Sequence, residues 1–137
     1  MLKRLSRDEL LANIAKLVAK RGTCSRLHVG VVLAREGRII SMGYNGVPAG
    51  MTHCCHPYHT DTPCALTVHA EANSIAYAAK TGVATDGATM YCTHSPCNDC
   101  AKLIINAGIK RVVYWEEYRD TKPISLLARA GVGVEQF

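Results

Sequence analysis

Apolar residues recur with two different periods along the chain, and these periods divide it into alternating helices and strands. Between residue 7 and about residue 20 the apolar positions follow helical spacing, and Ser6 is placed to cap the first turn. Short apolar runs rich in β-branched residues separate the later helical stretches, and Gly or Pro marks most boundaries. The predicted helices are 7–20, 68–80, 97–107 and 123–130, and the predicted strands are 29–34, 38–41, 88–92, 111–114 and 132–137.

The order of these elements is α-β-β-α-β-α-β-α-β. It predicts an α/β fold, namely a three-layer α/β/α sandwich around one mixed sheet of about five strands. The first two strands are separated by Glu36-Gly37, which predicts a β-hairpin. Because the chain has 137 residues and contains no linker, repeat or low-complexity segment, we expect a single domain over 1–137.

Two stretches have no regular period. Residues 43–50 are too rich in Gly and Pro for a helix or strand and predict a shaped loop, where a ligand can approach the backbone closely. Residues 51–67 form a polar insertion that could not hold a shape by burial, so we expect a metal to hold it. The candidate ligands in this insertion are His53, Cys54, Cys55, His56, His59 and Cys64.

Composition narrows the function classes. A hydrophobic content of 48% suits a globular core, while no apolar run approaches the length of a membrane span. No signal-peptide core follows the basic N-terminus, so we expect a cytoplasmic protein, in which seven cysteines favour metal ligation over disulfides. The net charge of +5 suits an anionic ligand. The basic residues are scattered along the chain and aromatic residues are few, which favours a small phosphorylated substrate over a nucleic acid.

Two short motifs carry the candidate chemistry. His69 stands two residues before Glu71 at the start of one predicted helix, and Cys97 stands three residues before Cys100 at the start of the next. An imidazole and two thiolates supply three ligands of a tetrahedral zinc site and leave the fourth position to water, as in catalytic rather than structural zinc sites. Glu71 is too close to His69 in sequence for a comfortable fourth ligand, and is well placed to move protons to and from that water.

Each motif alone has an ordinary explanation, because Cys-x-x-Cys can be a redox pair and His-Ala-Glu is common helix composition. Together, with Pro96 before the first cysteine, they match the H-x-E…P-C-x-x-C signature of zinc nucleobase deaminases. The predicted reaction is hydrolytic deamination without a redox cofactor. Glu71 would take a proton from water and return it to a ring nitrogen and then to the leaving amine.

The chain resembles the deoxycytidylate deaminase family, in its phage and bacterial branch. The resemblance rests on GYNG-x-P-x-G at 43–50, HAEAN at 69–73 and PCNDCAK at 96–102, with AGIKR at 107–111 and Tyr118 downstream, and it runs over nearly the whole chain. It implies conversion of dCMP to dUMP, which supplies thymidylate synthesis. It also implies a homohexamer, activated by dCTP and inhibited by dTTP, with Mg²⁺ on the effector triphosphate.

The same resemblance implies a role for each residue of the site. Asn45 matches the residue that binds the deoxyribose hydroxyl, Tyr118 the residue that closes over the substrate, and Arg26 is the candidate for the 5′-phosphate. The competing interpretations are a solvated surface residue for Arg26, a turn residue with positive φ for Asn45, and ordinary packing for Tyr118. The remaining implied roles are zinc ligands for His69, Cys97 and Cys100, proton shuttle for Glu71, base contacts for Ala70 and Ser95, and effector-triphosphate contacts for Gly43, Tyr44, Asn45 and Gly46.

Two features depart from the family's pattern. His94 stands where relatives commonly carry an apolar residue, and a surface position is its preferred interpretation, with contact to the substrate or a neighbouring subunit as the alternative. The insertion resembles a second, structural zinc site of some phage members, but Thr67 stands where a carboxylate ligand is usual. Cys24, Cys54 and His59 match three of its ligands, and Cys64 is the preferred fourth in a closed Cys₃His site, with His53, Cys55 and His56 as rivals.

Two other functions stay open at this point. A tRNA adenosine deaminase, or another nucleobase or nucleoside deaminase, shares the metal motif but would want a basic path for a nucleic-acid strand and no triphosphate loop. A non-catalytic binding module stapled by zinc would leave Glu71 without a role. Replacing Glu71 with Gln separates catalysis from binding, since a binding module would lose nothing.

Overall fold

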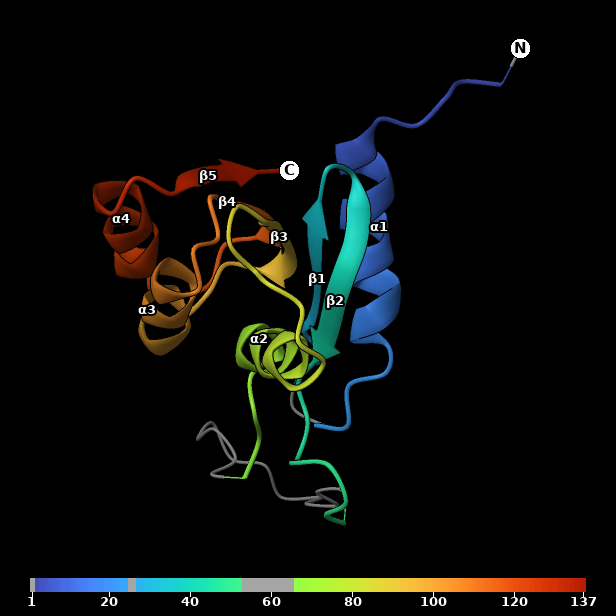
Figure 1. Ribbon diagram of the computed structural model, residues 1–137, viewed down its shortest axis with the longest axis vertical. Coiled ribbons are helices and arrows are strands. Elements are labelled where there is room, and N and C mark those ends of the chain that lie inside the picture. The colour runs from blue at the N-terminus through green and yellow to red at the C-terminus, as the bar shows by residue number, and fades with distance from the viewer. Residues whose placement is uncertain (1, 25–26, 53–65) are drawn as a thin grey trace.

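A computed structural model describes residues 2–24, 27–52 and 66–137 of the chain. Its helices and strands follow the predicted order, and they are drawn and labelled in Figure 1. The elements are α1 (Arg7–Ala19), β1 (Gly30–Arg35), β2 (Arg38–Tyr44), α2 (Ala70–Lys80), β3 (Thr89–His94), α3 (Asn98–Asn106), β4 (Arg111–Glu116), α4 (Lys122–Arg129) and β5 (Gly133–Gln136).

The strands form one five-stranded sheet in the order β2-β1-β3-β4-β5. Strand β1 is antiparallel to both β2 and β3, whereas β3, β4 and β5 run parallel to one another, so the predicted mixed sheet is confirmed. The predicted hairpin is confirmed as well. Glu36 and Gly37 have φ values of 54° and 75° between β1 and β2, as the tight two-residue turns of β-hairpins require.

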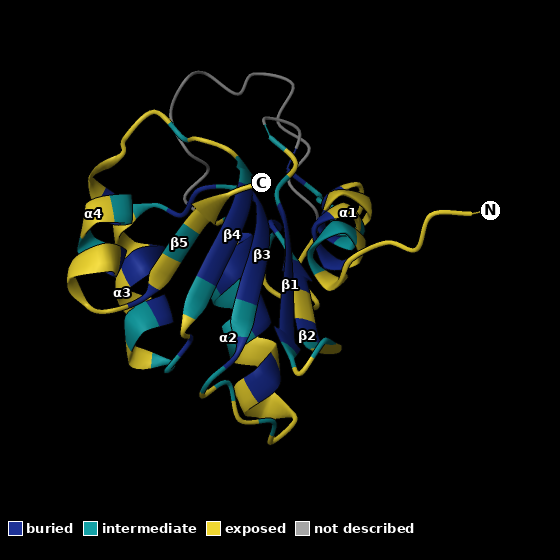
Figure 2. Cartoon of the chain, turned by 90° about the horizontal axis from the view of Figure 1, so that it is seen from above, coloured by how far each residue is buried: buried dark blue, intermediate teal, exposed yellow. Residues whose placement is uncertain are grey.

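Helices cover both faces of the sheet, which makes three layers (Figure 2). On one face, α1 packs Leu11 and Ala15 against alternate strand residues such as Val32. On the other face, α2, α3 and α4 enclose a larger core whose residues include Met90 and Ile104. Alternation along each strand therefore supplies two separate apolar surfaces, and the expected α/β/α sandwich is confirmed. None of the helices in the described ranges is long and apolar enough to cross a membrane.

Most predicted boundaries differ from the observed ones by one or two residues, and the largest difference is at the end of β2. Gly43 and Tyr44 were expected in a loop but are the last two residues of β2, where they pair with Val31 and Gly30. The glycine serves packing: a Cβ at Gly43 would lie 2.7 Å from both the carbonyl oxygen of Ala70 and the backbone nitrogen of Ser74. The glycine therefore allows the first turn of α2 to lie directly on the strand.

Candidate active site

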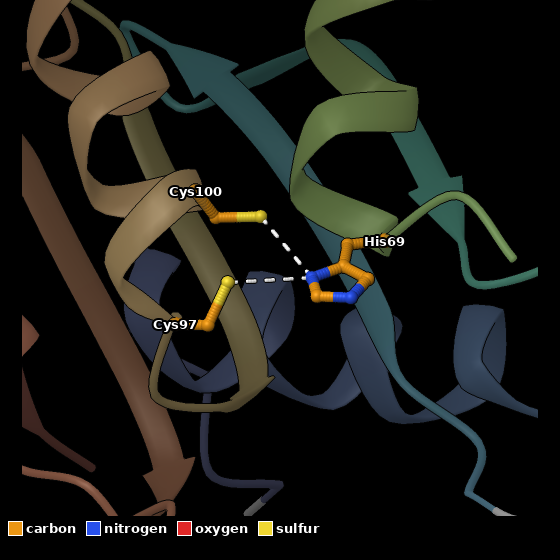
Figure 3. A group of neighbouring side chains, drawn as sticks. All are labelled: His69, Cys97 and Cys100. Carbon is orange, nitrogen blue, oxygen red and sulfur yellow. Dashed lines mark hydrogen bonds between the residues drawn. The ribbon is translucent and has the colours of Figure 1, made fainter. Parts of the chain in front are cut away.

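Two helix N-termini meet at one point and bring three predicted ligands together. His69 is the N-cap of α2, Cys97 is the N-cap of α3, and Cys100 lies in the first turn of α3. The Nδ1 atom of His69 lies 3.4 Å from the Sγ atoms of both cysteines (Figure 3). Within the part of the chain that the structure describes, these three residues form the one cluster suited to holding a metal ion, with ligand atoms within 4.8 Å of one another.

The donor atoms fit zinc in type and spacing. Tetrahedral zinc with Zn–S bonds of about 2.3 Å and Zn–N bonds of about 2.0–2.1 Å holds sulfur and nitrogen ligands about 3.6 Å apart. The observed Nδ1–Sγ distances of 3.4 Å are close to that spacing. An imidazole and two thiols are also ligands that zinc prefers over magnesium or calcium. The three side chains can therefore converge on one ion with little rearrangement.

The surroundings of the cluster favour a thiolate. Hydrogen bonds with Cys100 and His69 lower the pKa of the Cys97 thiol, and the hydrogen bond with Cys97 raises the pKa of His69. Neither N-cap side chain is used to cap its helix, so the unpaired backbone N–H groups of both first turns lie at the site. Together with the positive ends of the helix dipoles, they favour the anionic form that binds zinc.

Glu71 lies in the first turn of α2 with only 4% of its surface exposed. Burial raises the pKa of its carboxyl, although a hydrogen bond with Cys100 opposes that shift. A carboxyl whose pKa is moved toward neutrality can both accept and return a proton near pH 7. Its position two residues after His69 thus places a buried carboxyl beside the metal cluster.

One pocket contains most of the predicted site. It joins the metal cluster to the ends of β2, β3 and β4, and four of the five residues predicted to bind substrate line it. The fifth, Arg26, lies outside the described residues. The lining residues are Cys24, Leu27, Val29, Asn45, Thr67, His69, Ala70, Glu71, His94, Ser95, Cys97 and Tyr118.

Asn45 builds one wall of this pocket. Its side chain is buried, with Oδ1 accepting a hydrogen bond from the Val29 backbone at 2.8 Å and Nδ2 donating one to the Leu27 carbonyl at 2.5 Å. Among the described residues the only non-glycine with positive φ is Glu36, so the competing interpretation of Asn45 as a positive-φ turn residue is wrong. The amide instead fixes the chain segment that leads into β1.

Ser95 and Tyr118 also line the pocket. The backbone N–H of Ser95 donates to the carbonyl of Glu116 at 2.9 Å, and the Ser95 hydroxyl accepts from the backbone N–H of Tyr118 at 2.6 Å. The segment after β4 is thereby tied to the segment after β3. Tyr118 is half-buried and lines the pocket.

The preferred interpretation of His94 as a surface residue is wrong. Its side chain is only 18% exposed and lines the pocket beside Ser95. The Nδ1 atom lies 2.9 Å from the hydroxyl of Thr93, and Nε2 lies 3.4 Å from a carboxylate oxygen of Glu116. Burial lowers the pKa of His94. The last residue of β3 faces the pocket because the strand ends there and the chain turns toward Cys97.

The predicted second zinc site is only partly described. Cys24 is buried and lines the same pocket as His69, and Thr67 lines it as well. No hydrogen-bond partner is found for the buried Thr67 hydroxyl among the residues that the structure describes. The other proposed ligands and their rivals, Cys54, His59, Cys64, His53, Cys55 and His56, lie outside the described residues.

The residues predicted to bind an effector separate into two groups. Gly43, Tyr44 and Gly46 line a second pocket, whereas Asn45 lines the first. Sequence analysis did not identify Leu27 and Val29 as pocket residues, nor Arg21 and Tyr77 as residues of the second pocket. Val29 was predicted as a strand residue and Leu27 as part of the loop before it, and a single exposed Arg after a helix or Tyr on a helix carries no signal in one sequence.

Comparisons with known proteins agree with this geometry. Residues 5–116 match the family model described as the cytidine and deoxycytidylate deaminase zinc-binding region. ComE operon protein 2 of Bacillus subtilis is 46% identical over 139 residues, which cover 98% of this chain and 73% of that protein. Deoxycytidylate deaminase of Enterobacteria phage T4 is 36% identical over 163 residues, covering 88% of this chain and 84% of the phage protein.

A solved structure matches the fold over nearly all of both chains. The dCMP deaminase of cyanophage S-TIM5, crystallised with dCMP and dUMP, superposes with a TM-score of 0.90 at 36% identity. The match covers 99% of this chain and 100% of the cyanophage chain.

Proposed function

The chain belongs to the family of cytidine and deoxycytidylate deaminases, and from this membership and the geometry of the first pocket we propose that it converts dCMP and water to dUMP and ammonia. The observation that carries the proposal is the convergence of His69, Cys97 and Cys100 beside the buried carboxyl of Glu71. A non-catalytic zinc module has no use for a buried acid whose pKa is raised beside three candidate metal ligands.

The residues of the pocket account for the chemistry. A zinc ion held by His69, Cys97 and Cys100 would supply the Lewis acidity that makes water a nucleophile near neutral pH. Glu71 takes one proton from the attacking water and passes it to the adjacent ring nitrogen as the new C–O bond forms at the amino-bearing carbon. It then delivers the second proton to the amine, which leaves as ammonia when the C–N bond breaks.

The walls of the pocket position the nucleotide. Asn45 supplies a rigidly held amide for the deoxyribose hydroxyl, and Ser95 and the backbone of Ala70 line the base. Tyr118 covers the base. Its backbone N–H donates to the Ser95 hydroxyl, which fixes the segment after β4. Arg26 is assigned to the 5′-phosphate because its guanidinium fork matches the oxygen atoms of that group.

Regulation and assembly are further parts of the proposal. We assign dCTP as activator and dTTP as inhibitor, each with Mg²⁺, to the pocket lined by Gly43, Tyr44 and Gly46, in a homohexamer. The charge of this pocket supports an anionic effector. Among the described residues that line it, Arg21 is the one charged side chain, and none is acidic. A structural zinc on Cys24, Cys54, His59 and Cys64 completes the proposed cofactors.

The test is the ultraviolet absorbance of zinc-loaded protein mixed with dCMP, with and without dCTP and Mg²⁺. Loss of the cytosine band is expected, and it is expected to be faster with dCTP. The matched control is Glu71→Gln, which keeps the shape of the side chain but cannot carry a proton. Zinc-loaded protein that leaves dCMP unchanged in both mixtures, yet deaminates adenosine in tRNA, would contradict the proposal.

A further inference from the structure

Leu27 and Val29 present two apolar side chains to the first pocket. Both residues are half-buried and line the pocket, whereas His28 between them is exposed. This alternation is typical of extended backbone, in which residues two positions apart point to the same side. The segment that leads into β1 therefore turns an apolar face toward the pocket, and the proton transfers at Glu71 use neither side chain.

The same two residues hold the amide of Asn45. The backbone N–H of Val29 donates to Oδ1 of Asn45 at 2.8 Å, and Nδ2 donates to the carbonyl of Leu27 at 2.5 Å. The backbone N–H of Asn45 also donates to the carbonyl of Val29 at 3.2 Å. Three hydrogen bonds thus fix Asn45 to this segment, so the side chains of Leu27 and Val29 flank its amide along the pocket.

The Asn45 amide keeps one hydrogen-bonding position free on each of its polar atoms. An amide oxygen accepts two hydrogen bonds and an amide nitrogen donates two, and the neighbouring backbone uses one of each. The remaining positions suit a hydroxyl group, which both donates and accepts. In dCMP the one free hydroxyl is on C3′ of the deoxyribose, because the 5′ position carries the phosphate.

The carbon next to C3′ is C2′, where ribose carries an additional hydroxyl. With the 3′-hydroxyl on Asn45, C2′ comes next to the side chains that flank the amide. Neither Leu27 nor Val29 has a polar atom in its side chain, and Asn45 already occupies the backbone N–H of Val29 and the carbonyl of Leu27. A 2′-hydroxyl would leave water without gaining a partner here, which disfavours binding.

We propose that Leu27 and Val29 are specificity-determining residues that select 2′-deoxyribose over ribose in the first pocket. The inference rests on the proposed function, which places the sugar hydroxyl of dCMP on Asn45. An apolar site rejects a ligand that differs only by an added hydroxyl about 10²-fold. The expected ratio of kcat/KM for dCMP to kcat/KM for CMP in the wild-type protein is of that order.

Two variants offer the 2′-hydroxyl a partner. Val29→Thr replaces one methyl group with a hydroxyl and keeps the shape of the side chain. Leu27→Gln places an amide at the other position, and its matched control is Leu27→Met, because both new side chains are unbranched and similar in size. The dCMP to CMP ratio should fall about tenfold in Val29→Thr and in Leu27→Gln. It should stay within about twofold of wild type in Leu27→Met, which remains apolar.

The measurement is kcat/KM of zinc-loaded protein for dCMP and for CMP, together with the Kd values of dUMP and UMP from calorimetry. The two products differ at C2′ in the same way as the two substrates, so both ratios report the same contact. A variant that only weakens the fold lowers both members of each pair and leaves their ratio unchanged. A change in the ratio therefore separates sugar selection from a merely structural role.

The outcomes separate this inference from the proposed function. Wild-type protein that deaminates dCMP and CMP with similar kcat/KM overturns the role of Leu27 and Val29 and leaves the deaminase activity intact. The same holds if both polar variants keep the wild-type ratio, or if Leu27→Met loses it as Leu27→Gln does. Protein that prefers dUMP over UMP, loses this preference in the polar variants and never deaminates dCMP supports sugar selection and overturns the activity. If one polar variant does not fold, the other decides.

Discussion

The Nδ1 atom of His69 lies 3.4 Å from the Sγ atom of Cys97, although the two residues are 28 positions apart in sequence. This contact exists because α2 and α3 begin side by side, each with one of the two residues as its N-cap. The distance is close to that between two ligands of one tetrahedral zinc ion. The metal site is thus a consequence of where two helices start.

Cys97→Ser should remove one zinc ion per chain relative to the wild-type protein, because a hydroxyl is a far poorer zinc ligand than a thiolate. Elemental analysis of purified protein measures this loss. The matched control is Cys92→Ala, since Cys92 is buried in β3 and lies outside the ligand cluster. If Cys97→Ser retained the wild-type zinc content, or Cys92→Ala lost the same ion, the ligand assignment would be wrong.

Glu71→Gln should lower kcat for dCMP about 10²–10⁴-fold, as expected when a general acid and base is lost. The amide has the size of the carboxyl, so zinc content and the Kd of dUMP should stay near wild-type values. Steady-state kinetics, elemental analysis and calorimetry measure the three quantities. An unchanged kcat with zinc bound would exclude Glu71 as the proton carrier.

Gly43→Ala should destabilise the protein by about 3 kcal/mol, because the added Cβ collides with backbone atoms of Ala70 and Ser74 that cannot rotate away. Gly82→Ala is the control. Gly82 has φ +72° and open space around it. An alanine there meets no other atom, so only its left-handed backbone should lower the free energy of unfolding, by about 1–2 kcal/mol. Denaturant unfolding measures both. Equal losses would show that Gly43 is not a close-packing position.

Asp8 gives a pH dependence of stability. The Arg111 guanidinium donates to both Asp8 carboxylate oxygens, at 3.0 Å and 2.7 Å, and holds the pKa of that carboxyl below its usual value of 3.8. A lowered folded pKa stabilises the folded state above pH 3.8, and this stability is lost as the pH falls through the folded value. The pair is partly exposed, so we expect about 1 kcal/mol.

Thermal unfolding of wild-type protein and Asp8→Asn across pH 3 to 7 checks this expectation. The wild-type Tm should exceed that of the variant by about 4 °C near pH 7. The difference should shrink below about pH 4 as the carboxyl takes up a proton. A difference that stayed constant down to pH 3 would mean that the ion pair does not contribute through its charge.

Most of the fold was predictable from the sequence because local signals agreed with the tertiary structure. The capping box of Ser6 and Glu9 starts α1, the Glu36-Gly37 turn sets the hairpin, and apolar alternation marks the strands. The end of β2 was not predictable in this way. From sequence alone Gly43 is predicted to be a loop residue. Its glycine is needed because α2 packs closely on it, through Ala70 and Ser74, which lie 27 and 31 positions further along the chain.

The metal cluster and Glu71 could be recognised from spacing, since the chemistry needs those residue types at those positions. The rest of the pocket could not. His94 reads as an ordinary polar residue after a strand, and only the turn of the chain toward Cys97 places it in the pocket. The division of Asn45 and Gly46 between two pockets depends on the bridge between Gly46 and Val68, which no local pattern reveals.

The most direct test of the central claim is mass spectrometry of the product formed from dCMP in ¹⁸O-labelled water by zinc-loaded protein. Hydrolytic deamination transfers one oxygen atom from water to the base, so the account predicts dUMP that carries one ¹⁸O atom, as the carbonyl oxygen on the carbon that bore the amine. The same product should form far more slowly with Glu71→Gln. Recovery of unchanged dCMP from wild-type protein with a full complement of zinc would contradict the account.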